Sequence, residues 1–287
     1  MKGVILAAGY GTRFLPATKT IPKEMFPLID TPAIDVIVRE MVEAGIEDIL
    51  IVTSRRKKPL EDYFDREVEL ETLFREAGSQ EKLETILPVN VNIFFMRQQQ
   101  MAGTGDALLL VEPFAGGSPF VVAYPDDILI KGPNLTAQLI ALYNRTGHTV
   151  LAGQWVPTGD ISRFGVMATE VRDGVEYVKA MVEKPKRGTE PSRLVGYGRY
   201  LYAPEIFEAL KATRKDVQGR EFTQTEAIQR LAAKFKVVVQ RFEGKILDVG
   251  TPQGYLHSFI EFGLLREEFR SDLLAYMREV LRREGEG

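Results

Sequence analysis

The sequence has no cysteine and only two histidines among its 287 residues. The lack of cysteine excludes disulfide bonds, thiolate nucleophiles and zinc sites built on thiolates. The histidines, His148 and His257, belong to no recognisable acid–base constellation. We therefore interpret both as structural residues, and the catalytic groups must be sought among carboxylates, amides and cations.

Long apolar runs and a large excess of charge are also missing. No run approaches the roughly 20 apolar residues of a membrane span, and residues 9–13 interrupt the first apolar stretch before it can form a secretory signal. The chain has 37 Lys and Arg against 40 Asp and Glu, which argues against a general nucleic-acid binder. We expect a cytoplasmic protein that binds neither membranes nor nucleic acids. An anionic substrate would need a local cluster of cations.

The first 25 residues combine a strand, a glycine loop and cations. Residues 4–8 are apolar and predict a buried strand, and the loop Ala7–Thr12 that follows contains Gly9 and Gly11. Glycine lets backbone N–H groups approach an anion closely. Arg13 and Lys23 follow the loop. This combination predicts a cradle for a triphosphate.

Two common phosphate loops do not match this stretch. The dinucleotide fingerprint needs a third glycine, and that position is Phe14. A P-loop ends in Gly-Lys-Ser/Thr, which does not occur in the chain. An ordinary strand and turn would also explain a glycine pair, but Arg13 and the tripeptide Pro22-Lys23-Glu24 favour a phosphate site.

The chain alternates strands and helices, which predicts an α/β fold. A helical pattern runs from Pro32 to a stop at Gly45, between strands at 4–8 and 49–52, and indicates a βαβ unit with parallel strands. We expect short outer helices within 57–87, a helix capped by Asn134, and an apolar helical face within 253–283 that packs on the core first and forms an oligomer interface second. Further strands are expected at 91–96, 119–124, 149–156, 164–167, 175–182, 198–202 and 235–242, and further helices at 135–144, 204–210 and 225–234.

Polar residues follow several of the predicted strands, where open parallel sheets bind ligands. Gln98, in the loop 97–106, can pair with both a donor and an acceptor on a base edge, although a solvated loop glutamine would look the same. Asp126 and Asp127 follow another strand, and Asp248 lies at a third strand end. Carboxylates at these places suit Mg²⁺, although paired aspartates also occur as loop or cap residues.

The motifs together resemble those of the bacterial sugar-1-phosphate nucleotidylyltransferases, in particular the uridylyltransferases. The resemblance covers most of the chain. It rests on Ala7-Ala8-Gly9-Tyr10-Gly11-Thr12-Arg13, Pro16-Ala17-Thr18-Lys19, Pro22-Lys23-Glu24-Met25, Glu183-Lys184-Pro185 and Asp248-Val249-Gly250-Thr251. Without the resemblance, the Glu-Lys-Pro tripeptide would be interpreted as a surface turn.

The resemblance implies a Rossmann-like fold, with a doubly wound, mostly parallel mixed sheet flanked by helices. It implies one nucleotidyltransferase domain over 1–287, with a nucleotide-binding half at about 1–130, a sugar-phosphate-binding half at about 131–252 and C-terminal helices at 253–284. The implied reaction joins UTP and glucose 1-phosphate into UDP-glucose and pyrophosphate, with Mg²⁺ as cofactor. A homo-oligomer, dimer or tetramer, is also expected.

The resemblance also implies roles for individual residues, carried over by matching motifs. The implied nucleotide-binding residues are Ala8, Gly9, Gly11, Thr12, Arg13, Lys23, Glu24, Gln98, Gly103 and Asp126. The implied sugar-phosphate-binding residues are Asp127, Gly165, Glu183, Lys184 and Gly198. Asp126 and Asp248 are the implied metal ligands, and Arg13, Lys23 and Lys184 the implied catalytic residues.

Two departures from the family pattern bear on substrate choice. The family commonly continues Gly-His-Ala where this chain has Gly105-Asp106-Ala107, and residues 219–226 differ from the family's Gly-Glu-Ile-Gln-Leu-Thr-Asp stretch. Use of dTTP, or of another hexose or N-acetylhexosamine 1-phosphate, therefore stays open.

Two other classes of protein are disfavoured. A nicotinamide oxidoreductase is disfavoured by Phe14, which stands where the dinucleotide fingerprint needs glycine. A non-catalytic subunit that senses sugar nucleotides is disfavoured because it would have no need to retain Lys23, Asp126, Lys184 and Asp248.

Overall fold

The computed structural model describes residues 1–217 and 221–285. Gly219 and Arg220, which belong to one of the two departures from the family pattern, lie outside the described residues. The main sheet comprises β1 (Lys2–Leu6), β4 (Asp48–Thr53), β5 (Asn92–Arg97), β6 (Phe120–Ala123), β8 (Thr149–Trp155), β9 (Gly165–Arg172), β10 (Val175–Glu183), β11 (Leu194–Tyr202) and β12 (Val237–Arg241). Two small antiparallel pairs accompany it, β2 (Pro27–Leu28) with β3 (Thr31–Pro32) and β7 (Asp127–Ile130) with β13 (Lys245–Asp248).

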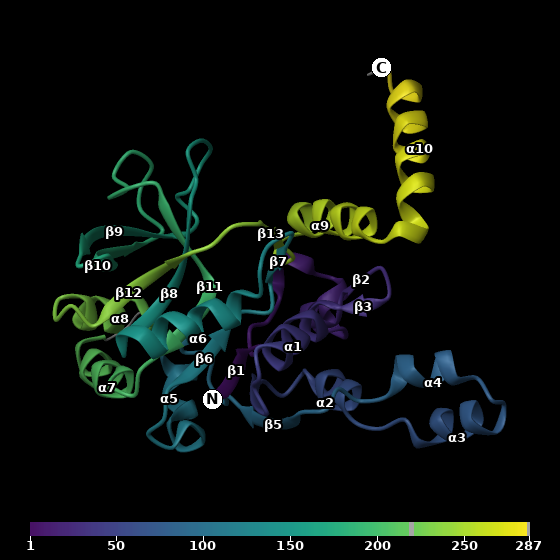
Figure 1. Ribbon diagram of the computed structural model, residues 1–287, viewed down its shortest axis with the longest axis horizontal. Helices are drawn as coiled ribbons and strands as arrows, with labels where there is room; N and C mark the ends of the chain where they lie inside the picture. The colour runs from purple at the N-terminus through teal and green to yellow at the C-terminus, as the bar shows by residue number, and fades with distance from the viewer. Residues whose placement is uncertain (218–220, 286–287) are drawn as a thin grey trace.

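The sheet has the strand order β5–β4–β1–β6–β11–β8–β12–β10–β9 (Figure 1). Within the described residues, seven of these nine strands run in one direction, while β10 and β11 run in the other. The start of β11 also pairs with β9, so the sheet curls at that end. The expected mostly parallel mixed sheet is therefore confirmed.

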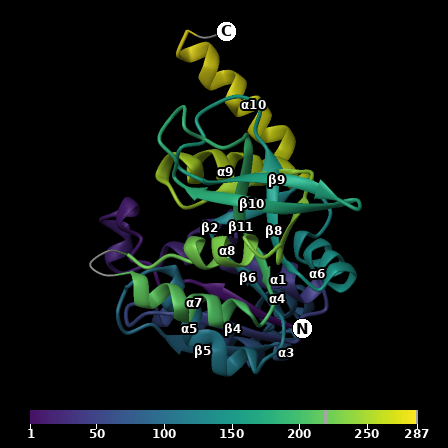
Figure 2. The same ribbon diagram turned by 90° about the vertical axis from the view of Figure 1, so that its left-hand side faces the viewer.

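Helices cover both faces of the sheet, as the alternation of apolar residues along the strands requires. In β1, Val4 belongs to one apolar cluster and Ile5 to the other, and both are fully buried. On the Ile5 face lie α1 (Ala33–Glu43) and α6 (Leu135–Thr146). On the Val4 face lie α5 (Thr104–Ala115), α7 (Ile206–Asp216) and α8 (Thr225–Ala232), with α8 against β10 (Figure 2).

The order of the strands creates a crevice between β1 and β6. From β1 the chain moves outward to β4 and β5, and then returns through α5 to place β6 on the other side of β1. At such a switch point the loops after the two strands diverge, and ligands bind there at the carboxyl ends of the strands. The glycine loop follows β1 and Asp126 follows β6, so both lie at this crevice.

Several helix boundaries have the predicted chemistry. The Asn134 side chain accepts a hydrogen bond from Ala137 N at 3.0 Å and caps α6. Gly45, with φ +83°, follows the last turn of α1, where a left-handed residue ends a helix. The short outer helices are α2 (Lys58–Phe64), α3 (Val68–Glu76) and α4 (Gln80–Ile86). α2 lies against the body and buries Leu60 in the core, whereas α3 and α4 extend away from the sheet in Figure 1.

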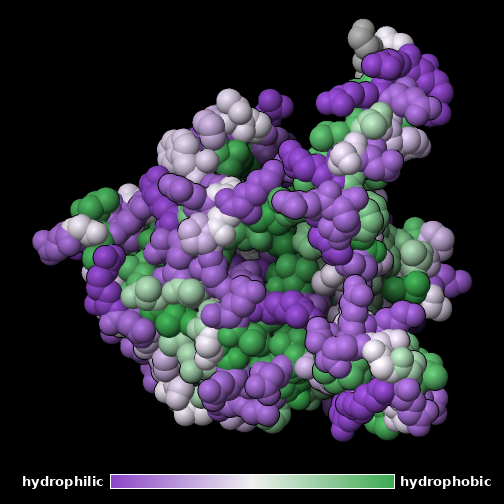
Figure 3. All heavy atoms as spheres, turned by 45° about the vertical axis from the view of Figure 1, so that its right-hand side comes forward, coloured by the Kyte–Doolittle hydropathy of each residue, from purple (hydrophilic) through white to green (hydrophobic). Residues whose placement is uncertain are grey.

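The C-terminal helices differ from the expectation of core packing. α9 (Pro252–Leu265) packs against β13 and β2, but α10 (Glu267–Arg283) packs mainly on α9 and buries none of its own residues. Figure 3 shows α10 projecting from the rest of the molecule. The interpretation of the 253–283 face as core is therefore wrong for α10. Its apolar spacing marks a helix face without requiring that the chain itself cover that face.

Candidate active site

The glycine loop is held in place from both sides. Ala7 N donates to Val52 O of β4 at 2.8 Å, and Thr18 Oγ1 donates to Gly11 O at 2.8 Å. Gly11 has φ +67°, and a Cβ on it would lie 3.1 Å from the Thr18 side chain. The left-handed conformation therefore favours glycine at this position, and a Cβ would also crowd Thr18.

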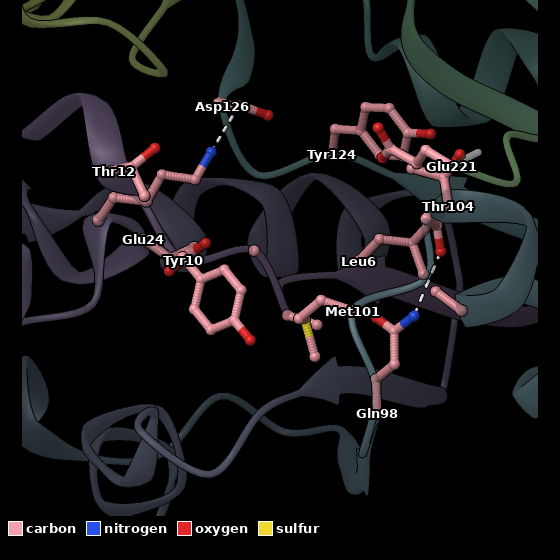
Figure 4. A pocket seen from close by; sticks show the side chains of 15 residues that line it. Leu6, Tyr10, Thr12, Glu24, Gln98, Met101, Thr104, Tyr124, Asp126 and Glu221 are labelled. Atoms are coloured by element: carbon pink, nitrogen blue, oxygen red, sulfur yellow. Dashed lines mark hydrogen bonds and ion pairs between the residues drawn. The ribbon is translucent and has the colours of Figure 1, made fainter. Parts of the chain in front are cut away.

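A cavity of about 560 Å³ lies beside this loop, at the crevice between β1 and β6. Figure 4 looks into it, with Thr12 and Glu24 on one side, Thr104 and Glu221 on the other, and Gln98 at its edge. The implied nucleotide-binding residues that line it are Ala8, Gly9, Thr12, Lys23, Glu24, Gln98, Gly103 and Asp126. Gly11 and Arg13 lie beside it rather than in its wall, and Arg13 donates from a terminal guanidinium nitrogen to Gly250 O at 3.4 Å.

Lys23 and Asp126 form an ion pair in this cavity. Lys23 Nζ lies 2.6 Å from Asp126 Oδ2, and the side chains are 17% and 28% exposed. Burial disfavours both charged forms, but their mutual attraction outweighs it, so the pKa of Lys23 is raised and the pKa of Asp126 is lowered. A fixed cation and a fixed carboxylate therefore meet where the loops after β1 and β6 converge.

A second, more deeply buried ion pair involves Glu24, the residue after Lys23. Lys57 Nζ donates to both oxygens of Glu24, at 2.7 and 2.8 Å, and both side chains are almost fully buried. Burial lowers the pKa of Lys57, although Glu24 opposes the shift. The sequence analysis did not identify Lys57, because a lysine within the charged run 55–58 has no local sign of burial. Glu24 thus lines the cavity with its carboxylate already paired.

The loop 97–106 closes the cavity on the side of β5. Gly103 has φ +112°, and a Cβ on it would lie 2.2 Å from Phe222 O. Phe222 in turn accepts from Gly105 N at 3.0 Å and donates to Ala102 O at 2.9 Å. These contacts fix the loop against a segment more than one hundred residues further along the chain. Gln98, which is 5% exposed, therefore has a defined orientation.

A second cavity of about 260 Å³ adjoins the first, and Thr104, Tyr124 and Glu221 line both. All of the implied sugar-phosphate residues line the second cavity: Asp127, Gly165, Glu183, Lys184 and Gly198. The three shared residues were not identified from the sequence. Tyr124 ends the strand predicted at 119–124, and Thr104 lies in the loop 97–106, so their positions at strand ends could have indicated them.

The second cavity has a narrow, glycine-lined wall. A Cβ on Gly198 would lie 2.6 Å from Tyr124 Cβ, and a Cβ on Gly165 would lie 2.5 Å from Met181 Cε. Glu183 accepts from Thr225 Oγ1 at 3.3 Å, and Lys184 Nζ lies 3.8 Å from Glu183 Oε1. The Lys184 side chain is 63% exposed, and Lys184 lines the cavity.

Asp248 lies close to Asp126 although the two are 122 positions apart in the sequence. Strand β13 pairs Asp248 with Asp127, and Val249 N donates to Asp126 O at 2.9 Å. Asp248 Oδ1 accepts from Gly250 N at 2.9 Å, and a Cβ on Gly250 would lie 2.7 Å from Asp126 Oδ2. The two carboxylates therefore flank the same glycine at the edge of the first cavity.

Fold and site together define the class of protein. The sequence profile of the nucleotidyl transferase family matches residues 2–262, and the chain belongs to this family. Among curated proteins it is similar to UTP–glucose-1-phosphate uridylyltransferases. One from Staphylococcus epidermidis is 42% identical over 97% of this chain and 98% of that protein. One from Bacillus subtilis is 42% identical over 99% of this chain and 96% of that protein.

Solved structures give the same grouping. A UTP-bound UGPase from Acinetobacter baumannii superposes with a TM-score of 0.86 at 34% identity, covering 97% of this chain and 98% of that one. A UDP-glucose pyrophosphorylase in complex with UDP-glucose superposes with a TM-score of 0.80 at 38% identity, covering 92% of this chain and 99% of that one.

Among residues 1–217 and 221–285, none of the helices combines the length and the apolar character of a membrane span.

Asp127 is the most perturbed carboxyl at the junction of the two cavities. Burial and the neighbouring Asp126 carboxylate raise the pKa of Asp127 to about 7, although Gly198 N donates to its Oδ2 at 2.7 Å. Between about pH 3.8, the ordinary pKa of this carboxyl, and about pH 7, Asp127 therefore keeps its proton in the folded protein and has lost it in the unfolded chain. The contribution of Asp127 to stability consequently falls as pH rises through this window.

Replacement of Asp127 by Asn should remove this pH dependence, because the amide keeps an oxygen for Gly198 N and loses the charge. We expect Asp127→Asn to be more stable than the parent at pH 8 by about 1–3 kcal/mol, since one pKa unit corresponds to about 1.4 kcal/mol and residual solvent contact reduces the effect. Urea unfolding from pH 4 to 8 measures it. The gain should vanish toward pH 4. Asp173→Asn, in the exposed β9–β10 turn, is the control. A gain that is the same at every pH would contradict this explanation.

Proposed function

We propose that the chain is a UTP–glucose-1-phosphate uridylyltransferase, which makes UDP-glucose and pyrophosphate. The observation that carries the proposal is the pair of adjoining cavities. The first has the Lys23–Asp126 pair and the glycine loop, and the second has Lys184 beside Glu183. Such an arrangement suits two phosphorylated substrates that meet at one phosphorus atom. The names of the similar proteins support the same reaction.

The reaction needs alignment and charge stabilisation more than an enzyme nucleophile. The phosphate oxygen of glucose 1-phosphate is already a nucleophile at neutral pH, so it attacks the α-phosphorus of UTP in line while pyrophosphate departs. Arg13 and Lys23 hold the β- and γ-phosphates and stabilise charge on the departing pyrophosphate. Lys184 binds the sugar phosphate and aligns its attacking oxygen. In this proposal these three are the catalytic residues.

The remaining residues bind and select the substrates. The backbone of the loop from Ala8 to Thr12 approaches the phosphates, while Gln98 and Gly103 contact the base. Asp127 and Glu183 contact the sugar, and Gly165 and Gly198 leave room for it. In this proposal residues 1–130 bind mainly the nucleotide and residues 131–252 mainly the sugar phosphate. Tyr124 and Thr104 from the first half also line the second cavity.

The carboxylates of Asp126 and Asp248 would hold Mg²⁺. Oxygen ligands suit this ion, which keeps several waters and is completed by substrate phosphates. Within residues 1–217 and 221–285 no cluster of three or more His, Cys, Asp or Glu side chains could hold a metal, so the protein would offer these two carboxylates and the substrates the rest. When bound, the ion would supply positive charge at the α-phosphate. Lys23 would remain the fixed cation beside Asp126.

The proposal also includes a homo-oligomer, a dimer or a tetramer. Several large apolar side chains of α9 and α10 are exposed, among them Leu256 at 59% and Tyr276 at 58%. A helix that buries none of its residues leaves an apolar face for another subunit. Light scattering of the purified protein gives the number of subunits.

A nucleotide panel tests the choice of base. Uracil and thymine share the edge that Gln98 could contact, so they differ only in the thymine methyl, and one methyl is worth about 1–3 kcal/mol in a pocket. With glucose 1-phosphate and Mg²⁺, we expect fastest pyrophosphate release from UTP, measurable release from dTTP and none from ATP or GTP. Equal rates with a purine nucleotide would contradict base selection by the loop 97–106. A parallel panel of hexose and N-acetylhexosamine 1-phosphates ranks the sugars.

Lys184 and Lys23 should have separable effects, because they line different cavities. A charge-assisted hydrogen bond is worth roughly 1.5–3 kcal/mol, and more if its loss misaligns the attacking oxygen. Lys184→Ala should therefore lower kcat/KM for glucose 1-phosphate by about ten- to several-hundred-fold and leave UTP affinity almost unchanged. Lys23→Ala should weaken binding of UTP and pyrophosphate and also slow the transfer.

Calorimetry with UTP and steady-state kinetics in both substrates measure these effects. Lys186→Ala is the matched control, because Lys186 is an exposed loop lysine two residues after Lys184 that does not line the cavity. Loss of UTP binding in Lys184→Ala with an unchanged KM for glucose 1-phosphate would show that the two cavities are wrongly assigned.

A further inference from the structure

Asp106 belongs to one of the two departures from the family pattern, and the structure places it beside Gln98. Asp106 lies in the first turn of α5, three residues after the helix-capping Gly103. Its Oδ2 lies 3.4 Å from Gln98 Nε2, and Gly103 O lies 3.2 Å from the same nitrogen. The amide nitrogen of Gln98 therefore faces two acceptors.

These two acceptors determine the orientation of the Gln98 amide. The opposite orientation would place Gln98 Oε1 against a carbonyl oxygen and a carboxylate, without a hydrogen to share. Gln98 is 5% exposed, so water cannot readily compensate. In Figure 4 the amide oxygen of Gln98 consequently turns toward the cavity beside Met101. The Gln98 side chain therefore presents a hydrogen-bond acceptor, and no donor, to the cavity.

We propose that Asp106 is a positioning residue that selects uracil over cytosine, by holding Gln98 with its carbonyl oxygen toward the base. This inference rests on the proposed function, since it concerns the nucleotide of that reaction. Uracil carries a hydrogen on N3, which Gln98 Oε1 can accept. Cytosine has a lone pair at N3 and an amino group in place of O4, so its edge has the opposite pattern. A glutamine free to rotate could pair with N3 of either base, whereas one held with its oxygen toward the base can pair with N3 of uracil only.

Arg214 provides the second contact of Asp106. A terminal guanidinium nitrogen of Arg214 lies 3.4 Å from Asp106 Oδ1, and the guanidinium lies over the Phe222 ring at 5.4 Å. Oδ1 thus faces α7 while Oδ2 faces Gln98. An asparagine at position 106 can still turn its one oxygen toward Gln98 Nε2, and alanine cannot. This difference separates the effect on Gln98 from a general loss of packing.

The experiment compares UTP with CTP in the parent protein and in three variants: Asp106→Ala, Asp106→Asn and Arg214→Met. For each, calorimetry gives the Kd of both nucleotides, and pyrophosphate release with glucose 1-phosphate gives kcat/KM. Loss of one hydrogen bond between an amide and a charged acceptor should lower the preference for UTP over CTP by about three- to ten-fold in Asp106→Ala. Asp106→Asn and Arg214→Met should keep the preference within about two-fold, because both retain an acceptor facing Gln98. The KM for glucose 1-phosphate should not change.

The inference is overturned if Asp106→Ala keeps the parent's preference, or if UTP and CTP weaken equally in it. It is also overturned if Asp106→Asn loses as much preference as Asp106→Ala. If the alanine variant does not fold, Asp106→Ser makes the same test, because its hydroxyl is too short to reach Gln98. A parent protein that releases no pyrophosphate from UTP and glucose 1-phosphate would overturn the proposed function and this inference with it. If the parent protein does release pyrophosphate but Asp106→Ala has the same preference for UTP over CTP, only the inference is overturned.

Discussion

The site depends on one buried ion pair, between Arg199 of β11 and Glu40 of α1. Arg199, 1% exposed, donates to both carboxylate oxygens of Glu40 at 3.0 Å, and to Tyr124 O and Gly198 O at 3.1 and 3.0 Å. Thr136 Oγ1 of α6 donates to Glu40 at 2.6 Å. Burial disfavours the Glu40 carboxylate, but Arg199 outweighs it and the pKa of Glu40 is lowered. Removing one partner of such a pair typically costs about 3–5 kcal/mol.

This ion pair determines where both cavities lie. The Arg199 guanidinium donates to the backbone oxygens of Tyr124, the residue after β6, and of Gly198, in the middle of β11, and so holds these two segments together. Tyr124 lines both cavities, and the chain continues directly to Asp126 and Asp127. Because Asp127 Oδ2 accepts from Gly198 N, Gly198 also fixes this carboxyl, which lines the second cavity. The two cavities are therefore joined through one hydrogen-bonded junction.

Local sequence patterns predicted the parts of this arrangement that depend on local conformation. The glycine loop, Asp126 at the end of a strand and the alternation of strands and helices all follow from short-range spacing. The pairs Arg199–Glu40 and Lys57–Glu24 were not predicted, because the partners are 159 and 33 residues apart and neither has a local signature. The exposure of α10 was missed for a related reason. Apolar spacing indicates a helix face, and the sequence does not show whether the same chain covers that face.

The two departures from the family pattern have different consequences. Phe222, in the stretch that differs, still packs its backbone against Gly103 and Gly105, so the loop that carries Gln98 keeps its support. Asp106 presents to Gln98 a carboxylate, which only accepts hydrogen bonds. At Phe222 the contacts with the loop are made by backbone atoms, so they tolerate different side chains. In the other departure, a single side chain contacts the Gln98 amide directly.

In the proposed mechanism the sugar phosphate attacks the α-phosphorus of UTP directly, without a covalent enzyme intermediate. The most direct test is the stereochemistry of transfer from UTP that carries sulfur in place of one α-phosphate oxygen. A single in-line displacement inverts the configuration at phosphorus, so we predict inversion in the UDP-glucose analogue that forms. Retention would mean two successive displacements through an enzyme nucleophile, and would contradict the proposed roles of Lys23 and Lys184.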